Sequence, residues 1–395
     1  MPPAVSVIIP TFNSAATICQ AIDSVLAQTL GDLEIIVVDD GSTDDTARRL
    51  RPYEDRIDYY YQPNQERSVA RNRGIGRSRG TFIAFLDADD YWLPSKLELQ
   101  LPVMRAHPEL GLVYSWVNVV DQSGKTVGRL GHDLPHPEST GADYFEQLLL
   151  GDSVPTPSVV VRRDCLDSVG LFDESITYCE DWDLWLRIAG RYPFGHVAQV
   201  TACYRVRHSY LPEIFARHGL QVKRPCVIER ALTARPDIGI ELATRARQRV
   251  RWYSALIEFG MRDCKAAQGW VERMLRQGTV RDARAADLEG YLVAFALSLY
   301  DDHTPEAEAT AFVRFVLDNL LPELAFLRAR GRRIAGTVLA GYAFRARARG
   351  DYAAARATMR RALAKNPASA SNLGVLTTCV VGTWLDRVRG RHAEG

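Results

Sequence analysis

The sequence has almost no net charge and no long uninterrupted apolar run. Its 395 residues are 47% apolar and 25% charged, and the formal net charge is +1. The apolar stretch at residues 5–9 is too short for a secretory leader and is broken by Pro10, and residues 366–384 carry polar side chains throughout. Disordered and membrane-spanning classes are therefore disfavoured, and the overall charge gives no indication of nucleic-acid binding.

Cysteine is sparse and lacks the spacing of a metal site or a disulfide framework. The seven cysteines are odd in number, scattered, and form no C-x-x-C pair. This pattern favours reduced thiols that pack as small core residues. We therefore expect a cytoplasmic protein, with a peripheral contact at the inner face of a membrane left open as an alternative.

An apolar run that ends in three carboxylates stands at residues 81–90. Its FIAFL segment is apolar without alternation, which is typical of a strand buried on both faces of an α/β sheet. Asp87, Asp89 and Asp90 follow at the carboxyl end, where open α/β sheets bind ligands. Such crowded carboxylates repel one another unless a hard divalent cation neutralises them, and that cation would also accept a diphosphate. The alternative is an acidic turn that caps the next helix.

Strand and helix patterns alternate from residue 5 to residue 86. Apolar runs predict strands at residues 5–9, 33–38, 57–61 and 81–86, and helical spacing predicts helices at residues 18–26, 44–50 and 68–79. Alternation of this kind is typical of right-handed βαβ units in a mostly parallel sheet. Three strand ends with polar clusters are then expected at one edge of the sheet.

The pattern changes after residue 111. We expect a hairpin from residues 112–117 and 125–129, a helix at 144–150, a strand at 158–162 and a helix at 179–188. Three acids, Glu180, Asp181 and Asp183, fall in the first turn of that last helix. Acids there complement the helix dipole, which is their alternative to a functional role.

Beyond Arg230 the chain is rich in Ala, Leu and Arg at helical spacing. We therefore divide it into an α/β domain at residues 1–230 and an all-helical domain at residues 231–395. Residues 340–367 partly fit one tetratricopeptide-like helix pair. Residues 328–365 hold eleven basic residues and one acid, and we leave open a solvated face, a partner surface and a contact with anionic lipid.

Four segments together resemble the inverting nucleotide-sugar glycosyltransferases of the GT-A fold, the large family-two group. They are VSVIIPTFN at residues 5–13, VVDDGSTD at 37–44, ARNRGI at 70–75 and FLDADD at 85–90. A fifth, EDWDL at 180–184, is similar to that family's acidic acceptor-side motif. The resemblance implies a GT-A-type, Rossmann-like sheet domain, and it does not extend to the helical tail.

The resemblance also implies an activity. The family's members transfer a sugar, of the hexosyl type, from a nucleotide-diphosphate sugar, most often a UDP-sugar, with inversion at the anomeric carbon. The acceptor is a hydroxyl on a glycan, a lipid-linked or a protein molecule, as in polysaccharide biosynthesis. The cofactor expected is Mn²⁺ or Mg²⁺, which would bridge both phosphates as a Lewis acid.

Carried onto this chain, the family's motifs imply a set of donor-binding residues. Asp40 would accept the imide N–H of the base, Asp87 would contact the ribose or the water shell of the metal, and Asp89 would bind the metal itself. The other nucleotide-sugar-binding positions are Pro10, Thr11, Phe12, Asn13, Arg71 and Ala88. Two alternatives stay open: Asp39 and Asp40 both suit an Asx turn, and Arg71 suits either a phosphate or one of the aspartates.

The acceptor-side motif implies the catalytic base. A single displacement needs a base opposite the leaving diphosphate, and Asp181 is our choice by its match to the motif. Glu180 is placed with it as a catalytic residue, and Asp183 is a further competitor. The neighbouring Trp182 and Trp185 suit core packing better than stacking on a sugar ring.

Two departures from the family pattern and two rival functions remain. Residues 64–68 lack the glycine that usually precedes the ARN motif, and residues 204–208 match the family's Tyr-Arg segment only in part. A sugar-phosphate nucleotidyltransferase would need a glycine-rich basic loop, which residues 10–17 do not provide. A catalytically silent scaffold that acts through the helical tail is disfavoured by the intact acids.

Overall fold

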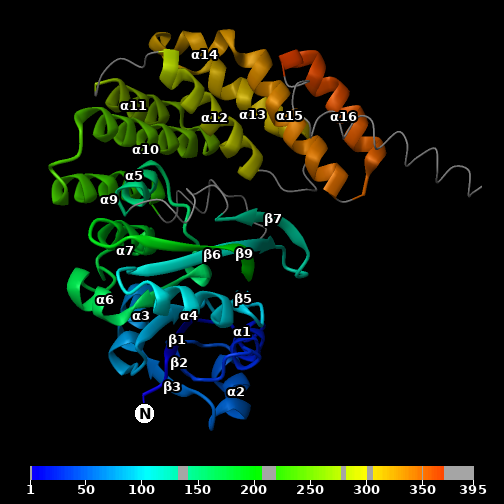
Figure 1. Ribbon diagram of the computed structural model, residues 1–395. Coiled ribbons are helices and arrows are strands. Elements are labelled where there is room, and N and C mark those ends of the chain that lie inside the picture. Colours follow the sequence, from blue (N-terminus) through cyan, green and yellow to red (C-terminus); the bar gives the residue numbers. More distant parts are fainter. Residues whose placement is uncertain are drawn as a thin grey trace, which may run out of the picture. The chain divides into compact units, whose positions relative to one another are not determined.

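The computed structural model describes residues 2–131, 141–206, 219–276, 282–299, 306–348 and 350–368 (Figure 1). The contacts divide the chain into two compact units. The first comprises residues 1–208 and 226–246, and the second comprises residues 209–225 and 247–395. Residues 207 and 208 of the partly matching segment lie outside the described ranges.

One mixed sheet of nine strands forms the centre of the described part of the first unit, in the order β3-β2-β1-β4-β8-β6-β9-β5 with β7 beside β6. The strands β3, β2, β1 and β4 are parallel, whereas β8 is antiparallel to β4 and β6. The bounds are β1 Val5–Thr11, β2 Leu33–Asp40, β3 Asp58–Gln62, β4 Phe82–Phe85, β5 Tyr91–Trp92, β6 Leu112–Val120, β7 Thr126–Leu130, β8 Val160–Arg162 and β9 Phe194–Arg205.

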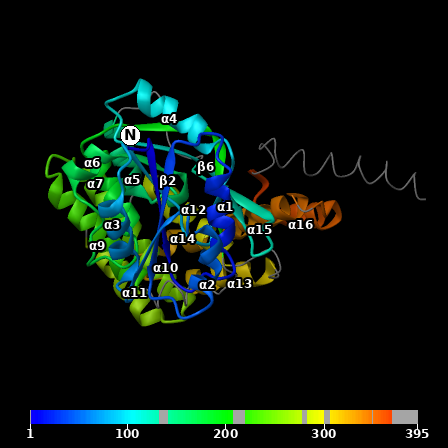
Figure 2. The ribbon, with the colours of Figure 1, turned by 90° about the horizontal axis from the view of Figure 1, so that it is seen from below.

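Helices cover both faces of the parallel part, so its strands are apolar on both sides. On one face Ile22 of α1 packs in a core with Val37 of β2, and on the other Ala70 of α3 packs against Ile36 and Val38. Figure 2 shows α1 and α3 on opposite sides of β2. The helices of this unit are α1 Ile18–Leu26, α2 Thr46–Leu50, α3 Glu66–Arg77, α4 Lys96–Ala106, α5 Gly141–Leu150, α6 Arg163–Val169 and α7 Glu180–Ala189, with 3₁₀ turns η1 Arg51–Tyr53 and η2 Thr156–Ser158.

The predicted strands and helices of residues 5–86 are confirmed, with ends that differ by up to two residues. The hairpin is confirmed as β6 and β7, but β6 also pairs with β8 and in parallel with β9. Both β5 and β9 were missed. β9 pairs with β6 through two register shifts, and its buried and exposed positions follow no regular alternation, so it lacks the period of a strand.

The side chain of Lys96 in α4 is buried in the first unit. Its Nζ lies 2.8 Å from the Ser158 carbonyl oxygen and 2.5 Å from the Gln100 amide oxygen, and it lies over the Trp92 ring. Burial lowers the pKa of the Lys96 ammonium well below its usual range. The folded protein therefore holds this lysine neutral at a pH where the unfolded chain protonates it.

Replacement of Lys96 by Met is expected to change how stability depends on pH. Over the pH range between the lowered pKa of folded Lys96 and the ordinary lysine pKa of about 10.4, the unfolded chain binds one more proton at Lys96 than the folded chain, so the wild-type free energy of unfolding gains up to about 1.4 kcal/mol per pH unit from this group. The Lys96→Met variant loses that gain. Urea unfolding at several pH values measures it, with Lys125→Met, at an exposed lysine, as the control. Parallel curves for wild type and Lys96→Met would contradict the neutral lysine.

The described part of the second unit is helical, and residues of α9 and α10 belong to both units. The bounds are α9 Leu220–Ala234, α10 Ile240–Gly260, α11 Cys264–Leu275, α12 Asp282–Leu299, α13 Glu306–Asp318, α14 Ala325–Ala329, α15 Gly331–Ala348 and α16 Tyr352–Lys365, with a 3₁₀ turn η3 at Pro322–Leu324. None of the helices in the described ranges combines the length and the apolar composition of a bilayer-spanning segment.

Several arginines of the basic stretch form ion pairs and hydrogen bonds within this unit. Arg330 and Arg333 of this stretch both pair with Glu289, Arg361 pairs with Glu306, and Arg345 donates to a carbonyl oxygen of α12. The pair α15 and α16 encloses a small core of Leu339, Ala340, Ala343, Met359 and Ala362. A helix pair is therefore present where the tetratricopeptide-like unit was expected, and its membership of a repeat stays a prediction.

Candidate active site

The loops that follow β1 and β2 are tied together at the carboxyl edge of the sheet. The Asn13 backbone N–H donates to Ser42 Oγ at 2.9 Å, and the Asn13 side-chain oxygen accepts from the Thr43 N–H at 2.8 Å. Thr11 is buried beside Asp39 in the parallel register, whereas the Phe12 side chain is 48% exposed. The expected base-binding segment thus forms a fixed platform with one exposed aromatic ring.

The neighbouring acids Asp39 and Asp40 are both buried but have different partners. Asp39 accepts from the Ser42 N–H at 2.8 Å and from the Tyr59 hydroxyl at 2.9 Å, so it holds the turn after β2, a structural role like the one that was among its alternatives. Asp40 Oδ1 instead accepts from the Gln62 side chain and the Gln65 N–H. Asp40 therefore anchors the loop before α3, at the end of β2.

Backbone strain is concentrated around this edge. Four non-glycine residues in the described chain have positive φ, and three of them, Asn13 (48°), Glu66 (74°) and Cys179 (65°), lie in the loop after β1, at the start of α3 and just before α7. Glu66 lies in the segment where the family's glycine is absent, so the backbone keeps a conformation that favours glycine. Residues held in this conformation cluster at functional sites.

Arg71 of α3 joins two acidic segments that are far apart in the sequence. Its guanidinium lies 2.7 Å from Asp87 after β4 and 2.6 Å from Glu180 at the start of α7. Arg71 and Glu180 are buried. Burial alone would raise the pKa of Asp87, but the Arg71 and Arg67 guanidiniums hold it below its usual range. The two partners expected for Arg71 were a phosphate and an aspartate, and the structure shows Arg71 paired with acids.

Replacement of Arg71 by Met is expected to destabilise the first unit by about 3–5 kcal/mol, because it removes the buried cation that contacts both Glu180 and Asp87 and leaves the more distant Arg67, 3.9 Å from Glu180. Arg77→Met is the matched control: it removes an arginine of the same helix whose ion pair with Asp58 is exposed, and should cost at most about 1 kcal/mol. Urea unfolding measures both. Equal losses of unfolding free energy in the two variants would mean that the buried bridge contributes no more to stability than the exposed ion pair.

The three aspartates of the acidic turn after β4 differ in their surroundings. The Asp90 N–H donates to the Asp87 carbonyl oxygen, and α4 begins only at Lys96, so the turn does not cap that helix. Asp90 is buried and accepts from the Arg205 N–H at 2.8 Å. Its burial, together with the charges of Asp87 and Asp89, raises the pKa of Asp90 well above its usual range. Asp90 is therefore a structural member of the turn.

This donor set fits a divalent cation that takes most of its ligands from a substrate. The described residues contain no group of three or more His, Cys, Asp or Glu side chains arranged for a metal. Asp87 and Asp89 are the partly exposed acids of the turn, whereas Ala88 between them is packed into the core. Mg²⁺ is typically held by one or two carboxylates together with substrate phosphates, and Asp89 suits that role.

Helix α7 carries Asp181 at its first turn, on a face different from that of Asp183. Asp181 is partly exposed, and its two oxygens accept from the Thr156 hydroxyl and from the Trp182 N–H, each at 2.8 Å. Asp183 is buried and pairs with Arg187 at 2.9 Å, as expected for a structural acid. Burial raises the pKa of Glu180 although Arg71 opposes it.

The tryptophans of α7 fix the helix to the sheet. Trp182 and Trp185 are fully buried, and the Trp185 ring lies 6.4 Å from the rings of Phe85 and Phe172. Core packing is confirmed for both, and neither is available to stack on a sugar. Phe85 ends β4, so the packing fixes Asp181 relative to the strand that leads to Asp87.

Tyr204 lies near the acids of both segments, and the sequence singled it out only as part of an incomplete match. Burial and the charges of Asp90, Asp87, Asp89 and Asp181 together raise the pKa of the Tyr204 hydroxyl. The next residue, Arg205, donates to the Asp89 carbonyl oxygen at 2.9 Å. The end of β9 therefore closes the acidic turn, and the charges of both the expected metal ligand and the expected base act on the Tyr204 hydroxyl.

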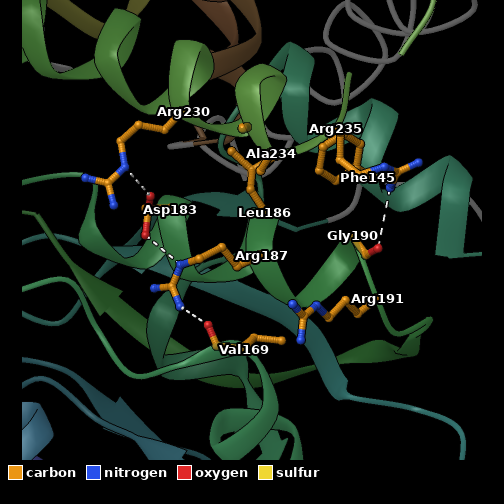
Figure 3. Close-up of a pocket in the computed structure, with 11 residues that line it drawn as sticks. Phe145, Val169, Asp183, Leu186, Arg187, Gly190, Arg191, Arg230, Ala234 and Arg235 are labelled. Atoms are coloured by element: carbon orange, nitrogen blue, oxygen red, sulfur yellow. Dashed lines mark hydrogen bonds and ion pairs between the residues drawn. The ribbon is translucent and has the colours of Figure 1, made fainter. Parts of the chain in front are cut away.

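A separate cavity of about 280 Å³ lies on the face of α7 that does not carry Asp181 (Figure 3). It is lined by Asp183, Leu186, Arg187 and Gly190, which share a helix face that excludes Asp181. In Figure 3, Arg187 reaches Asp183 and the Val169 carbonyl oxygen, and Arg235 reaches Gly190. These arginines pair with Asp183 and with carbonyl oxygens at the ends of the helices. The cavity is therefore separate from the acidic site that contains Asp181.

Comparisons with known proteins indicate the family of the N-terminal segment. Residues 6–166 match the family model described as Glycosyl transferase family 2. An uncharacterized glycosyltransferase of Rickettsia typhi is 35% identical over 202 residues, 49% of this chain and 62% of the relative. Chondroitin synthase of Escherichia coli is 31% identical over 210 residues, 52% of this chain and 29% of the relative. The matches thus span less than two thirds of these relatives' length.

A solved structure gives a weaker likeness. The mannosyltransferase PcManGT of Pyrobaculum calidifontis, solved with GDP-Man and Mn²⁺, is 17% identical and covers 84% of this chain and 87% of that one, with a TM-score of 0.47. The family model matches the segment that contains β1, β2 and β4 with their polar ends. The chain therefore contains a glycosyltransferase family 2 domain, with a helical region C-terminal to it.

Proposed function

We propose that the first unit catalyses metal-dependent, inverting transfer of a hexosyl group from a nucleotide-diphosphate sugar, first of all a UDP-sugar. The acceptor is a hydroxyl on a glycan, a lipid-linked or a protein molecule. The observation that carries the proposal is the buried Arg71 bridge, which sets the acidic turn containing Asp87 and Asp89 against the acids that begin α7. An acidic rim assembled from distant segments is what a cation-bound diphosphate and a base require.

Each part of the donor would contact different residues. The segment from Pro10 to Asn13 and Asp40 would hold the nucleobase, and Asp87 would contact the ribose. Asp89 would hold Mn²⁺ or Mg²⁺, which when bound supplies Lewis-acid neutralisation of the diphosphate. Because Arg71 is already paired with two carboxylates, its role in the donor site is to hold Asp87 in place.

The reaction itself is a single displacement at the anomeric carbon. A bond forms from the acceptor oxygen to that carbon while the bond to the phosphate oxygen breaks, and the diphosphate leaves with the electron pair. The acceptor proton passes to Asp181, the partly exposed acid at the start of α7. Glu180, paired with Arg71, would hold the first turn of α7 in place.

The test is a panel of UDP-, GDP- and dTDP-sugars offered with Mn²⁺ or Mg²⁺, with released nucleotide and the anomeric configuration of the product as readouts. We expect release from one donor class and an inverted product. Retention of configuration would rule out the single displacement. Calorimetry with nucleoside diphosphates, with and without metal, separates the silent scaffold, which binds none of them.

A further inference from the structure

The Thr156 hydroxyl donates a hydrogen bond to Asp181, the expected base. The sequence did not indicate this donor. Thr156 begins η2 and is 6% exposed, and its Oγ1 lies 2.8 Å from Asp181 Oδ2. The other oxygen of Asp181 accepts from the Trp182 N–H in its own helix. With one donor on each oxygen, the plane of the carboxylate is fixed, and one of the two donors comes from outside α7.

The turn that carries Thr156 is bound to the segment that follows the acidic turn. The Ser158 carbonyl oxygen accepts from Lys96 at 2.8 Å and from Gln100 at 2.7 Å, and the Pro157 carbonyl oxygen accepts from the Trp92 indole N–H at 3.0 Å. All three donors are buried side chains. They belong to β5 and α4, which come directly after Asp87, Asp89 and Asp90 in the sequence. We call Trp92, Lys96 and Gln100 the η2 clamp.

The η2 clamp gives the two halves of the site a common support. The strand β5 leaves the acidic turn, and the clamp holds η2 through its backbone carbonyl oxygens rather than through its side chains. Buried hydrogen bonds from several side chains to the same turn leave it little freedom. The position of the Thr156 hydroxyl is therefore set relative to the donor half of the site.

We propose that Thr156 is a positioning residue that aims the Asp181 carboxylate at the acceptor hydroxyl. The proposal rests on the proposed function, in which Asp181 is the base. It assigns to the η2 clamp the task of keeping that carboxylate at a constant distance from the metal-binding turn. A positioned base is worth most when its geometry is already correct before the acceptor binds.

The first test compares Thr156→Val with Thr156→Ser in the full chain. Valine keeps the shape and removes the donor, so we expect kcat to fall about tenfold, the effect of one ordinary hydrogen bond. The donor KM should not change, because the Thr156 hydroxyl contacts the expected base and not the expected metal ligand. Serine keeps the hydroxyl and should restore kcat. The control is Thr201→Val, which removes a buried hydroxyl bonded to Ser115 at 2.6 Å.

The second test does not depend on turnover. The ¹³C carboxyl chemical shift of Asp181 is compared without substrate in wild type and in Thr156→Val, and it should change in the variant because the carboxylate loses a hydrogen-bond donor. An unchanged chemical shift in a folded Thr156→Val protein overturns the proposal, as does wild-type kcat. If the chemical shift changes but wild type transfers no sugar from any donor, the proposed function fails, and with it the role of Thr156 in positioning a base.

Discussion

Replacement of Asp181 by Asn is expected to lower kcat for sugar transfer by roughly 10³-fold, within the range that a positioned general base contributes. The amide keeps the size of the carboxylate, and the Thr156 hydroxyl is able to turn and accept from it, so the fold should be unaffected. Affinity for the nucleoside diphosphate should stay as in wild type, because the proposed role of Asp181 is on the acceptor side. Initial rates with the active donor and calorimetry with the nucleotide measure the two effects.

Two further variants make this result specific. Asp167→Asn removes an exposed carboxylate from the neighbouring α6 and should leave turnover unchanged. Glu180→Gln should cost stability, because Glu180 is the buried partner of Arg71. If Asp181→Asn retains wild-type turnover while Glu180→Gln abolishes it, the base is Glu180, and the assignment of Asp181 is wrong.

The parallel half of the fold and the motif positions were predictable because short-range patterns determine them. Residues 35–38 and 82–86 are apolar without alternation, so both could be recognised as strands buried on two faces, and the polar clusters after them had to meet at one edge. The sequence left a structural turn open for both Asp39 and Asp40, and in the structure Asp39 accepts from the Ser42 N–H. The family resemblance then indicated which of these polar residues to expect in a donor site.

The contacts that assemble the two halves of the site were not predictable. Arg71 was left between a phosphate and an aspartate, and its pairing with Glu180 joins residues 109 positions apart. In the sequence Asp90 was one of three crowded carboxylates, and only the structure shows that it is buried and accepts from the backbone of β9. The contact from Thr156 to Asp181 depends on where η2 lies, which Lys96 and Trp92 determine from β5 and α4. Each depends on strand order in the second half of the sheet, where sequence periodicity is weak.

Replacement of Asp89 by Asn is expected to lower kcat/KM by roughly 10²–10³-fold, because a neutral amide holds Mn²⁺ or Mg²⁺ less tightly, and Lewis-acid stabilisation of the leaving diphosphate is worth several kcal/mol. The concentration of Mn²⁺ that gives half-maximal rate should rise, so excess metal should recover part of the activity. A metal titration of initial rates measures both effects in one experiment.

The matched control for Asp89→Asn is Asp90→Asn, in the same turn. Asp90 is buried and its Oδ1 accepts from the Arg205 N–H, a hydrogen bond that the amide oxygen of Asn keeps. Its half-maximal Mn²⁺ concentration should therefore equal that of wild type. If Asp90→Asn weakens metal dependence as much as Asp89→Asn, the cation interacts with the whole turn. If neither variant changes it, the cation does not bind at this turn, and the diphosphate must be neutralised by other groups at the rim.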